Sequence, residues 1–376
     1  MPYVPTWLLD PAVSHLNHGS FGATPCEVLD AQDELRRRLE ANPTRFMARE
    51  LPGLIDGARR VVSSFVGADP DGLVFVTNAT SGVNAVLRSL EFGPGDEILV
   101  TDHGYNACRN AAHVAAETAG AAVVEVGIPF PLTGSGEVVD AVSQAISSRT
   151  RLVMVDHVSS PTAVVFPVRE IIEAAGDIPV LVDGAHAPGM LDVDVDGLGA
   201  AFYTGNLHKW VCAPKGAGFL WSSAEFRDRL LPGTISHGWN AEWPGRNRYQ
   251  RMFDYVGTDD PTAWLSAPVA IDVMEAALPG GWPEVWTRNH ELVVTGRNIL
   301  LAALELEAPA PESMIGSMAA IILEPGPADE LRQWLHDEHA IEVPVLMWKG
   351  NRIVRISAQL YNRVEEYEGL ALALRP

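Results

Sequence analysis

The chain has 376 residues, and its 27 Lys+Arg against 48 Asp+Glu give a formal net charge of −21 at pH 7. That length suggests about two domains, and 47% hydrophobic with 20% charged residues is ordinary for a globular protein rather than a disordered one. The acidic balance argues against nucleic acid and against a membrane surface as partners, because both favour basic proteins. Only three of the basic residues are lysines, Lys209, Lys215 and Lys349, so any chemistry of a lysine amine must use one of them.

The cysteines and the N-terminus indicate a cytoplasmic protein without a metal centre. Cys26, Cys108 and Cys212 are odd in number and lack the spacing of a disulfide framework or a zinc site. The N-terminal segment MPYVPTWLLD lacks the basic start and the apolar run of a signal peptide. No stretch reaches the ~18 uninterrupted apolar residues that suggest a membrane-spanning helix.

Between Gly53 and Trp221, short apolar runs alternate with alanine-rich stretches that favour helix. This alternation is typical of an α/β protein in which helices cover both faces of a mainly parallel sheet. A further β-like run precedes Lys209. The other runs that we expect to form strands are Leu73–Thr77, Ile98–Thr101, Ala122–Val126, Leu152–Val155, Val180–Val182 and Gly218–Trp221.

The remainder of the chain predicts a loop followed by a smaller α+β unit. Glycine, proline, tryptophan and asparagine are frequent between Asn206 and Gly257, including residues 237–250, which indicates mostly loop. Residues 262–306 show helical periodicity. Beyond them we expect strands at Met318–Leu323, Ile341–Leu346 and Ile353–Ile356 and a helix at Asp329–His339. We therefore expect a large α/β domain over residues 20–258 and a small domain built from residues 1–19 and 259–376.

The residues most suggestive of chemistry follow the predicted strands. Asp183 comes directly after the run 180–182, and Lys209 follows the next β-like run. Ligands of such sheets bind beyond the carboxyl ends of the strands, so both side chains could face one crevice. Thr80 and Ser81 open an apparent helix after the first strand, where backbone N–H groups favour a phosphate. A lysine for a Schiff base, an acid for a ring nitrogen and a phosphate-binding turn are what pyridoxal phosphate requires.

With these motifs in place, the sequence resembles the class V aminotransferase superfamily, and most closely its isopenicillin N epimerase branch. The resemblance covers nearly the whole chain and implies fold type I of the pyridoxal-phosphate enzymes, with a large parallel-sheet domain and a smaller α+β domain. The matching segments, in chain order, are LNHGSFGATP (16–25), NATSGVNAV (78–86), DGAHAPG (183–189), YTGNLHKW with APKGAGFL (203–220), GTDDPTAW (257–264) and VRISAQLYN (354–362).

The resemblance implies a role for each matching position. Lys209 matches the Schiff-base lysine, which would also act as the base at the α-carbon, and Asp183 matches the partner of the pyridine nitrogen. His186 matches the residue near the phenolic oxygen, and these three are the catalytic candidates. The other candidates for holding the cofactor are Thr80 and Ser81 at the phosphate, His208 near the phosphate or the lysine, Tyr105 stacked on the ring, and Thr258, donated to the phosphate by the neighbouring subunit of a homodimer.

The substrate candidates lie near the two ends of the chain. Arg355 matches the arginine that clamps the α-carboxylate of an amino acid, a bidentate task suited to a guanidinium group. Asn17, His18 and Ser20 match the N-terminal loop that approaches the substrate. The resemblance therefore implies a shared active site between two subunits and a small amino-acid substrate. His103 is the alternative to Tyr105 for stacking on the ring.

The resemblance leaves the reaction open between two outcomes at the α-carbon. Removal of the α-proton by Lys209 leads either to epimerisation or to β-elimination with cleavage of the C–S bond of an S-substituted cysteine, in secondary metabolism. Epimerisation needs a second proton donor, for which His18, Tyr105 or water could serve. No cysteine follows Cys212, which disfavours sulfur transfer through an enzyme persulfide. Decarboxylating or oxidative deamination, transamination, a non-catalytic cofactor-binding regulator and a metal-dependent hydrolase are the alternatives.

Overall fold

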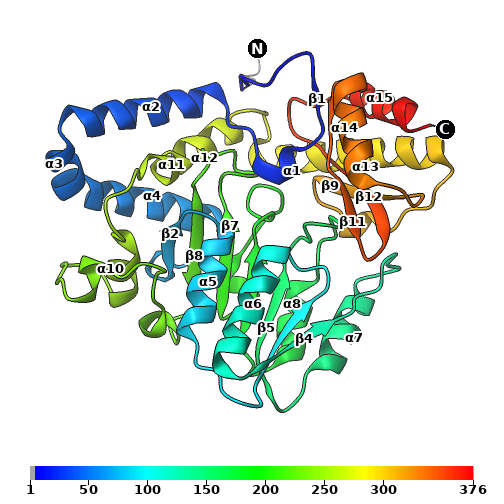
Figure 1. Ribbon diagram of the computed structural model, residues 1–376. Helices are drawn as coiled ribbons and strands as arrows, with labels where there is room; N and C mark the ends of the chain where they lie inside the picture. Colours follow the sequence, from blue (N-terminus) through cyan, green and yellow to red (C-terminus); the bar gives the residue numbers. More distant parts are fainter. Residues whose placement is uncertain (1–4, 376) are drawn as a thin grey trace.

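A seven-stranded sheet forms the centre of the computed structural model, which describes residues 5–375 (Figure 1). The strand order is β2-β8-β7-β6-β5-β3-β4. The five strands from β7 to β4 are parallel, whereas β8 runs antiparallel to both β7 and β2. The strands are β2 (Leu73–Val76), β3 (Glu97–Thr101), β4 (Ala122–Val126), β5 (Thr150–Asp156), β6 (Val180–Gly184), β7 (Phe202–Asn206) and β8 (Gly218–Ser222).

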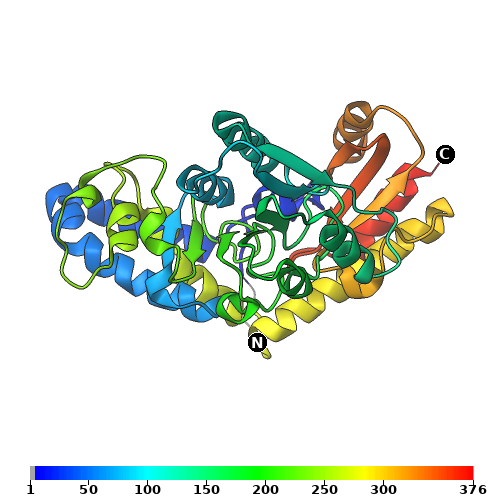
Figure 2. The same cartoon turned by 90° about the horizontal axis from the view of Figure 1, so that it is seen from below.

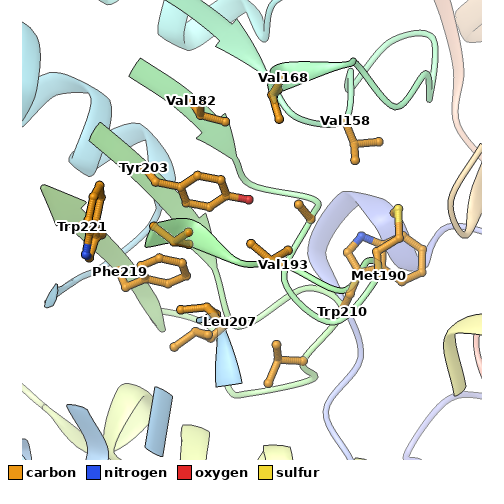
Figure 3. Packing of buried hydrophobic residues seen from close by; sticks show 14 of the residues in the cluster. Val158, Val168, Val182, Met190, Val193, Tyr203, Leu207, Trp210, Phe219 and Trp221 are labelled. Carbon is orange, nitrogen blue, oxygen red and sulfur yellow. The ribbon is translucent and has the colours of Figure 1, made fainter. Parts of the chain in front are cut away.

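Alternating side chains of these strands build one hydrophobic core on each face of the sheet. Val182, Tyr203 and Phe219 point to the same side and pack together (Figure 3). Leu181 and Phe202, each one residue away along its strand, belong to the core on the other face. Because both faces are covered, these strands are continuous apolar runs, which is why the sequence revealed them.

The predicted strands of the large sheet are confirmed, with ends that differ by up to two residues. β5 extends to Asp156 and β6 to Gly184, so Asp183 is the second-to-last residue of its strand rather than the residue that follows it. The loop expected over 206–257 contains a helix, α10 (Arg248–Asp254). Its start is marked by a capping box, in which the Asn247 side chain accepts from the Gln250 N–H at 2.8 Å.

A three-stranded antiparallel sheet, β11-β12-β9, forms the core of the smaller unit. The predicted strand 341–346 is divided by Pro344, which lacks the N–H that a sheet ladder requires. The N-terminal strand β1 (Ser14–His15) joins this unit by pairing in parallel with β10. The strands of this part are β9 (Met318–Leu323), β10 (Ile341–Glu342), β11 (Val345–Trp348) and β12 (Asn351–Ser357).

The helices that lie between β8 and β9 in the sequence indicate where the two domains divide. The helices α11 (Thr262–Leu265) and α12 (Ala267–Glu275) pack against α2 (Cys26–Ala41), whereas α13 (Gly281–Leu304) packs against β9 and α15 (Val364–Leu374). The boundary at 258/259 stays a prediction, and these contacts favour one nearer the start of α13. Figure 2 shows α2 and α10 at one end of the molecule and the small sheet at the other. The other α-helices are α1 (His18–Phe21), α3 (Pro43–Arg45), α4 (Leu51–Phe65), α5 (Ala79–Ser89), α6 (Asn106–Ala119), α7 (Gly136–Ala145), α8 (Val168–Ala175), α9 (Val195–Leu198) and α14 (Ala328–His339).

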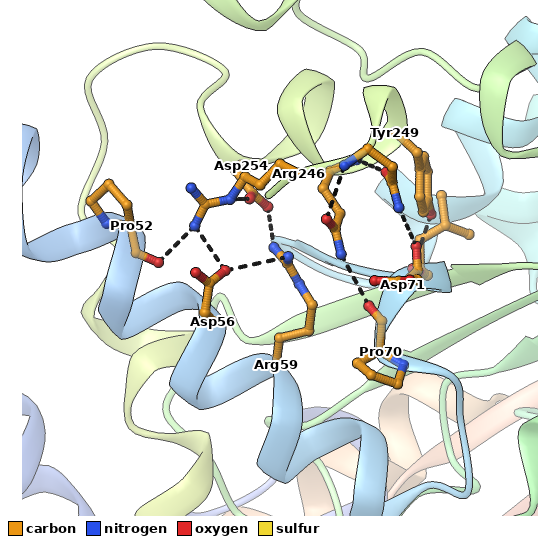
Figure 4. A network of polar contacts seen from close by, with 11 residues as sticks. Pro52, Asp56, Arg59, Pro70, Asp71, Arg246, Tyr249 and Asp254 are labelled. Atoms are coloured by element: carbon orange, nitrogen blue, oxygen red, sulfur yellow. Dashed lines mark hydrogen bonds and ion pairs between the residues drawn. The ribbon is translucent and has the colours of Figure 1, made fainter. Parts of the chain in front are cut away.

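A buried ionic network ties α10 to α4 (Figure 4). The Asp254 carboxylate at the end of α10 contacts the guanidinium groups of Arg59 on α4 and of Arg246, whose Nε lies 2.8 Å away. Arg246 also pairs with Asp56 at 2.8 Å. The network therefore anchors the loop that carries Thr258. Among residues 5–375, no helix has the length and apolar character needed to cross a membrane.

Candidate active site

The carboxyl ends of β5, β6 and β7 lie side by side and bring the main candidates together. Asp156 and Asp183 are register partners on the parallel strands β5 and β6. The turn after β7 carries Lys209, whose Nζ lies 3.1 Å from His186 Nε2. Asp183, His186 and Lys209 therefore meet at the edge of the sheet where ligands of such folds bind.

The Asp183 carboxyl group is buried and receives two hydrogen bonds. Its Oδ1 accepts from the Ala185 N–H at 3.0 Å, and its Oδ2 accepts from the Cys108 thiol at 3.0 Å. Burial raises the pKa of Asp183. Within the described residues, no arginine, lysine or histidine forms an ion pair with this carboxyl group. A buried acid without a cationic partner fits the protonated ring nitrogen of pyridoxal phosphate, which supplies the missing positive charge.

Backbone contacts hold the Lys209 turn in place. The Leu207 and His208 N–H groups both donate to the Ala217 carbonyl, at 2.9 and 3.1 Å. On the other side, His18 Nε2 lies 3.0 Å from the Lys209 carbonyl oxygen. Contacts with the start of β8 and with the N-terminal segment thus hold the turn from which the Lys209 side chain projects.

His186 lies between Trp210 and the amine of Lys209, and its neutral ring can donate to that amine once the amine has lost its proton. Trp210 Nε1 donates to His186 Nδ1 at 3.4 Å, so the ring proton of a neutral His186 lies on Nε2. That proton faces Lys209 Nζ, which accepts it only through the lone pair of a neutral amine. Burial and, second to it, the charge of Arg355 lower the pKa of Lys209 to about 8. Burial also lowers the pKa of His186 well below its usual range.

Arg355 on β12 is a buried cation without an acidic partner. Its Nη1 donates to the Ser160 hydroxyl at 3.2 Å and to the Ser160 carbonyl, and its Nη2 donates to the Ser20 hydroxyl at 3.1 Å. No carboxylate pairs with it in the part of the chain that the structure describes. Burial lowers its pKa to about 10. The arrangement suits the carboxylate of a substrate, and Ser160, which the sequence did not suggest, helps to aim the guanidinium group.

The remaining candidates of the N-terminal loop, Asn17 and His18, bond to other groups of the protein. Asn17 Oδ1 accepts from the Ser20 hydroxyl, and Asn17 Nδ2 donates to Glu342 at 3.0 Å, so Asn17 orients Ser20. His18 is buried between the Lys209 carbonyl and the Tyr361 hydroxyl, 3.0 Å from Nδ1, and burial lowers its pKa to about 3. Both ring nitrogens of His18 contact other groups of the protein, and its role toward the substrate stays a prediction.

The first turn of α5 has fewer free N–H groups than the sequence suggests. The Ser81 N–H donates to Asn78 Oδ1 and the Ala79 N–H to Asn206 Oδ1, each at 2.8 Å. Asn206 ends β7, three residues before Lys209, and was not predicted as a site residue. Thr80 and Ser81 line a cavity of about 410 Å³ that is also lined by residues 253–257 and 259–261. Their hydroxyl groups remain candidates for the phosphate.

His208 and Thr258 do not contact Lys209 through their side chains in this chain. His208 Nδ1 donates to the Ala217 carbonyl at 2.8 Å, and burial lowers the pKa of His208 to about 4. Thr258 is exposed, and its hydroxyl lies 3.2 Å from the Tyr255 hydroxyl. A role for Thr258 at a phosphate therefore requires the site of a second subunit.

Two aromatic candidates for ring stacking are placed differently. Tyr105, half-exposed at the start of α6, has its backbone N–H directed at the Asp156 carboxyl group beside Asp183. His103 is fully buried, with Nδ1 2.7 Å from Thr162 Oγ1 and its ring centroid 4.5 Å from that of Trp348. His103 therefore belongs to the packing between the two sheets, and Tyr105 stays the candidate for stacking.

Known proteins resemble this chain over nearly its full length. It is 38% identical to isopenicillin N epimerase of Amycolatopsis lactamdurans, with 98% of this chain and 96% of that protein aligned. It is 28% identical to L-cysteine desulfhydrase of Arabidopsis thaliana, with 96% and 87% aligned. The solved structure of the cystine C–S lyase C-DES with its product cysteine persulfide superposes with a TM-score of 0.83 at 22% identity, covering 97% and 98% of the two chains, which shows a shared fold.

The family model described as aminotransferase class V matches residues 20–370. This match includes the sheet edge that carries Asp183 and Lys209 as well as Arg355 of the smaller unit. The sequence expectation of fold type I agrees with the observed parallel sheet and with the superposition. The chain belongs to the class V aminotransferase family of pyridoxal-phosphate-dependent enzymes.

Proposed function

We propose that this protein acts at the α-carbon of an amino acid, and that it either inverts the α-carbon or eliminates the sulfur substituent of an S-substituted cysteine. Relatives named for both reactions, an epimerase and cysteine desulfhydrases, support this pair of outcomes. The observation that carries the proposal is the unpaired, buried Arg355 close enough to Lys209 to lower the pKa of its amine. An amino acid whose carboxylate binds Arg355 would hold its α-carbon near that amine.

Residues at the sheet edge would hold the cofactor. Asp183 would bind the ring nitrogen, Lys209 would attach the carbonyl end, and His186 would lie near the phenolic oxygen. Tyr105 would cover the ring, while Thr80, Ser81, Asn206 and His208 would line the phosphate end, with Thr258 of a second subunit. When bound, pyridoxal phosphate supplies an electron sink that makes bonds to the α-carbon easier to break.

The side chains then divide the work of proton transfer. Arg355 fixes the carboxylate of the amino acid through two donors, which restricts its orientation. The neutral Lys209 amine takes the proton from the α-carbon, and the nearby charge of Arg355 favours its release afterwards. The N–H of His186 faces Lys209 Nζ and directs its lone pair.

Tyr105 decides between the two outcomes. Elimination needs one base and a leaving group, whereas inversion needs a proton from the opposite face. His18 is held by the Lys209 carbonyl and by Tyr361, so it is not available for this task. Tyr105, half-exposed and close enough to interact with the charge of Arg355, is the remaining side-chain donor that the sequence suggested.

We propose a homodimer in the cytoplasm as the working form. The exposed Thr258 and an apolar groove of about 630 Å³ lined by Met47, Leu51, Ile55 and Trp243 support a second copy at this face. The three cysteines are free, which supports a reducing compartment.

The test is incubation of the holoenzyme in D₂O with an S-alkyl-L-cysteine and, separately, with a plain L-amino acid. Pyruvate and free thiol would establish elimination, and deuterium at the α-carbon with loss of optical purity would establish inversion. Lys209→Ala should abolish both, whereas Tyr105→Phe should suppress inversion and spare elimination. Absence of all these products with every amino acid tried would refute the proposal.

A further inference from the structure

The thiol of Cys108 contacts the acid at the centre of the site. Cys108 is the third residue of α6, is fully buried, and donates to Asp183 Oδ2 at 3.0 Å. The Thr80 hydroxyl faces the same sulfur from the phosphate end. Cys108 therefore stands between the residues assigned to the two ends of the cofactor, although neither the motifs nor the proposed mechanism uses it.

A second carboxyl group lies beside Asp183. Asp156 is its register partner on β5, and it is also buried. The backbone N–H groups of Tyr105 and Ser160 face Asp156, whereas Asp183 has the Ala185 N–H and the Cys108 thiol. Burial raises the pKa of both acids, and the charge of Asp183 raises that of Asp156 further. Two adjacent buried carboxylates repel each other, so a pair that shares one proton is favoured over a doubly ionised pair, while the nearby charge of Lys209 favours ionisation of both acids.

We propose that Cys108 is a positioning residue whose S–H bond keeps Asp183 ionised and leaves the shared proton on Asp156. A donor that bonds to a carboxylate favours its charged form. The thiol remains protonated because burial and the charge of Asp183 raise its pKa, so it acts as a fixed donor rather than as a nucleophile. The importance of this arrangement for catalysis rests on the proposed function, since only an ionised Asp183 holds a protonated ring nitrogen.

The hydrogen bond itself can be tested in the protein without cofactor. The infrared difference between wild type and Cys108→Ser isolates the S–H stretch of Cys108. We expect this band at a lower frequency than that of the partly exposed Cys26, obtained in the same way from Cys26→Ser, and we expect it to move upward in Asp183→Asn. A Cys108 band at the frequency of a free thiol, or a band whose frequency does not change in Asp183→Asn, would overturn the proposal.

The consequence is tested with pyridoxal phosphate labelled with ¹⁵N in the ring. Cys108→Ala and Cys108→Ser lose similar volume, but only serine keeps a donor. We expect the ring-nitrogen shift of a protonated ring in wild type, Cys108→Ser and the Cys26→Ser control, a shift toward the deprotonated ring in Cys108→Ala, and about tenfold faster cofactor loss in that variant. Equal spectra for the alanine and serine variants would contradict the assignment. Failure of wild type to bind the cofactor would refute the proposed function instead, while the infrared result would still decide the hydrogen bond.

Discussion

The three lysines of the chain occupy different surroundings. Lys209 lies against His186, Lys215 donates weakly to the Thr24 hydroxyl at 3.5 Å, and Lys349 pairs with Asp102. Lys209 alone among them joins the sheet edge that holds Asp183. The scarcity of lysine therefore has a practical use, because each amine can be followed separately by peptide mass.

The reactivity of Lys209 should rise at a lower pH than that of an ordinary lysine. Its folded pKa is about 8, so the amine is protonated and unreactive below that pH and becomes neutral as the pH rises through it. We expect labelling of the cofactor-free protein by acetic anhydride, followed by peptide mass, to show a midpoint near pH 8 at Lys209. In denatured protein the same peptide should titrate near the unperturbed value of about 10.4.

Arginine variants separate the effect of burial from the effect of the Arg355 charge on the pKa of Lys209. Arg355→Met removes a positive neighbour, so the midpoint at Lys209 should move to higher pH. Arg352→Met is the matched control, since residue 352 lies three positions away on β12 and therefore on its opposite face. An unchanged midpoint in Arg355→Met, or an equal shift in Arg352→Met, would show that Arg355 does not act on the amine.

Arg355 should also govern substrate affinity. Loss of charge-assisted hydrogen bonds to a carboxylate should raise KM for the amino acid at least about tenfold in Arg355→Met. Arg352→Met should leave KM within about twofold. Steady-state kinetics on the substrate found in D₂O decides the question, and a normal KM for Arg355→Met would remove Arg355 from the substrate site.

Residues were predictable where a motif fixes their place and not where packing does. Asp183 lies at the end of the parallel strand β6, Lys209 on the turn after β7 and Arg355 on β12 of the small sheet, and each of them stands in a motif of the sequence. His18 and His103 look equally chemical in the sequence, but the first supports the Lys209 turn and the second packs against Trp348. Cys108, Asn206 and Ser160 could not be predicted, because their partners come from distant segments of the chain.

Among the elements, the hairpin of β11 and β12 connects the small sheet to the large one. Trp348 Nε1 donates to the Asp102 carbonyl at 3.2 Å, and Lys349 pairs with the Asp102 carboxylate, which is buried just after β3. The same strand β12 carries Arg355 toward Ser160. The hairpin tip is therefore a second point of attachment that fixes the strand bearing Arg355.

Loss of the ion pair at the hairpin tip should make the position of Arg355 less well defined without changing the proton transfer at Lys209. In Lys349→Met the Asp102 carboxylate loses its ion-pair partner, so we expect KM to rise several-fold while kcat changes less than twofold. The double variant Lys349→Met with Asp102→Asn should recover part of the loss, because no buried charge is then left unpaired. A fall in kcat at constant KM would contradict this account of the hairpin.

The ionic network between α4 and α10 should be important for stability. Asp254→Ala leaves the buried guanidinium groups of Arg59 and Arg246 short of a partner, and breaking such a pair costs about 3 kcal/mol in free energy of unfolding. Glu34→Ala, which removes the exposed pair with Arg37, should cost less than about 0.5 kcal/mol. Urea unfolding of both variants checks the difference, and equal losses would show that the network adds nothing beyond a surface pair.

Element boundaries could be predicted where the apolar pattern is continuous. β4 and β9 match the expected ranges, since their runs end at turn residues. Proline divides the strand expected over 341–346, and α10 was hidden because its start depends on the Asn247 cap within a segment rich in glycine and tryptophan. Boundaries that depend on one or two residues, such as a proline or a helix cap, thus could not be predicted from hydrophobic periodicity.

Across the whole molecule, the site is assembled from both ends of the chain. The N-terminal segment pairs with β10 and brings Ser20 to Arg355, while the large sheet brings Asp183 and Lys209 to the same edge. The long sequence separation explains why the fold class was predictable whereas the contacts between the two units were not. The position of Arg355 relative to Ser20 therefore depends on the folding of the smaller unit.

The central claim is that pyridoxal phosphate attaches to Lys209. The most direct measurement is borohydride reduction of the holoenzyme followed by peptide mass analysis of the three lysines. The account predicts a phosphopyridoxyl adduct on the Lys209 peptide alone, and none in Lys209→Ala. An adduct on Lys215 or Lys349, or none on any peptide of an enzyme that carries the cofactor, would contradict it.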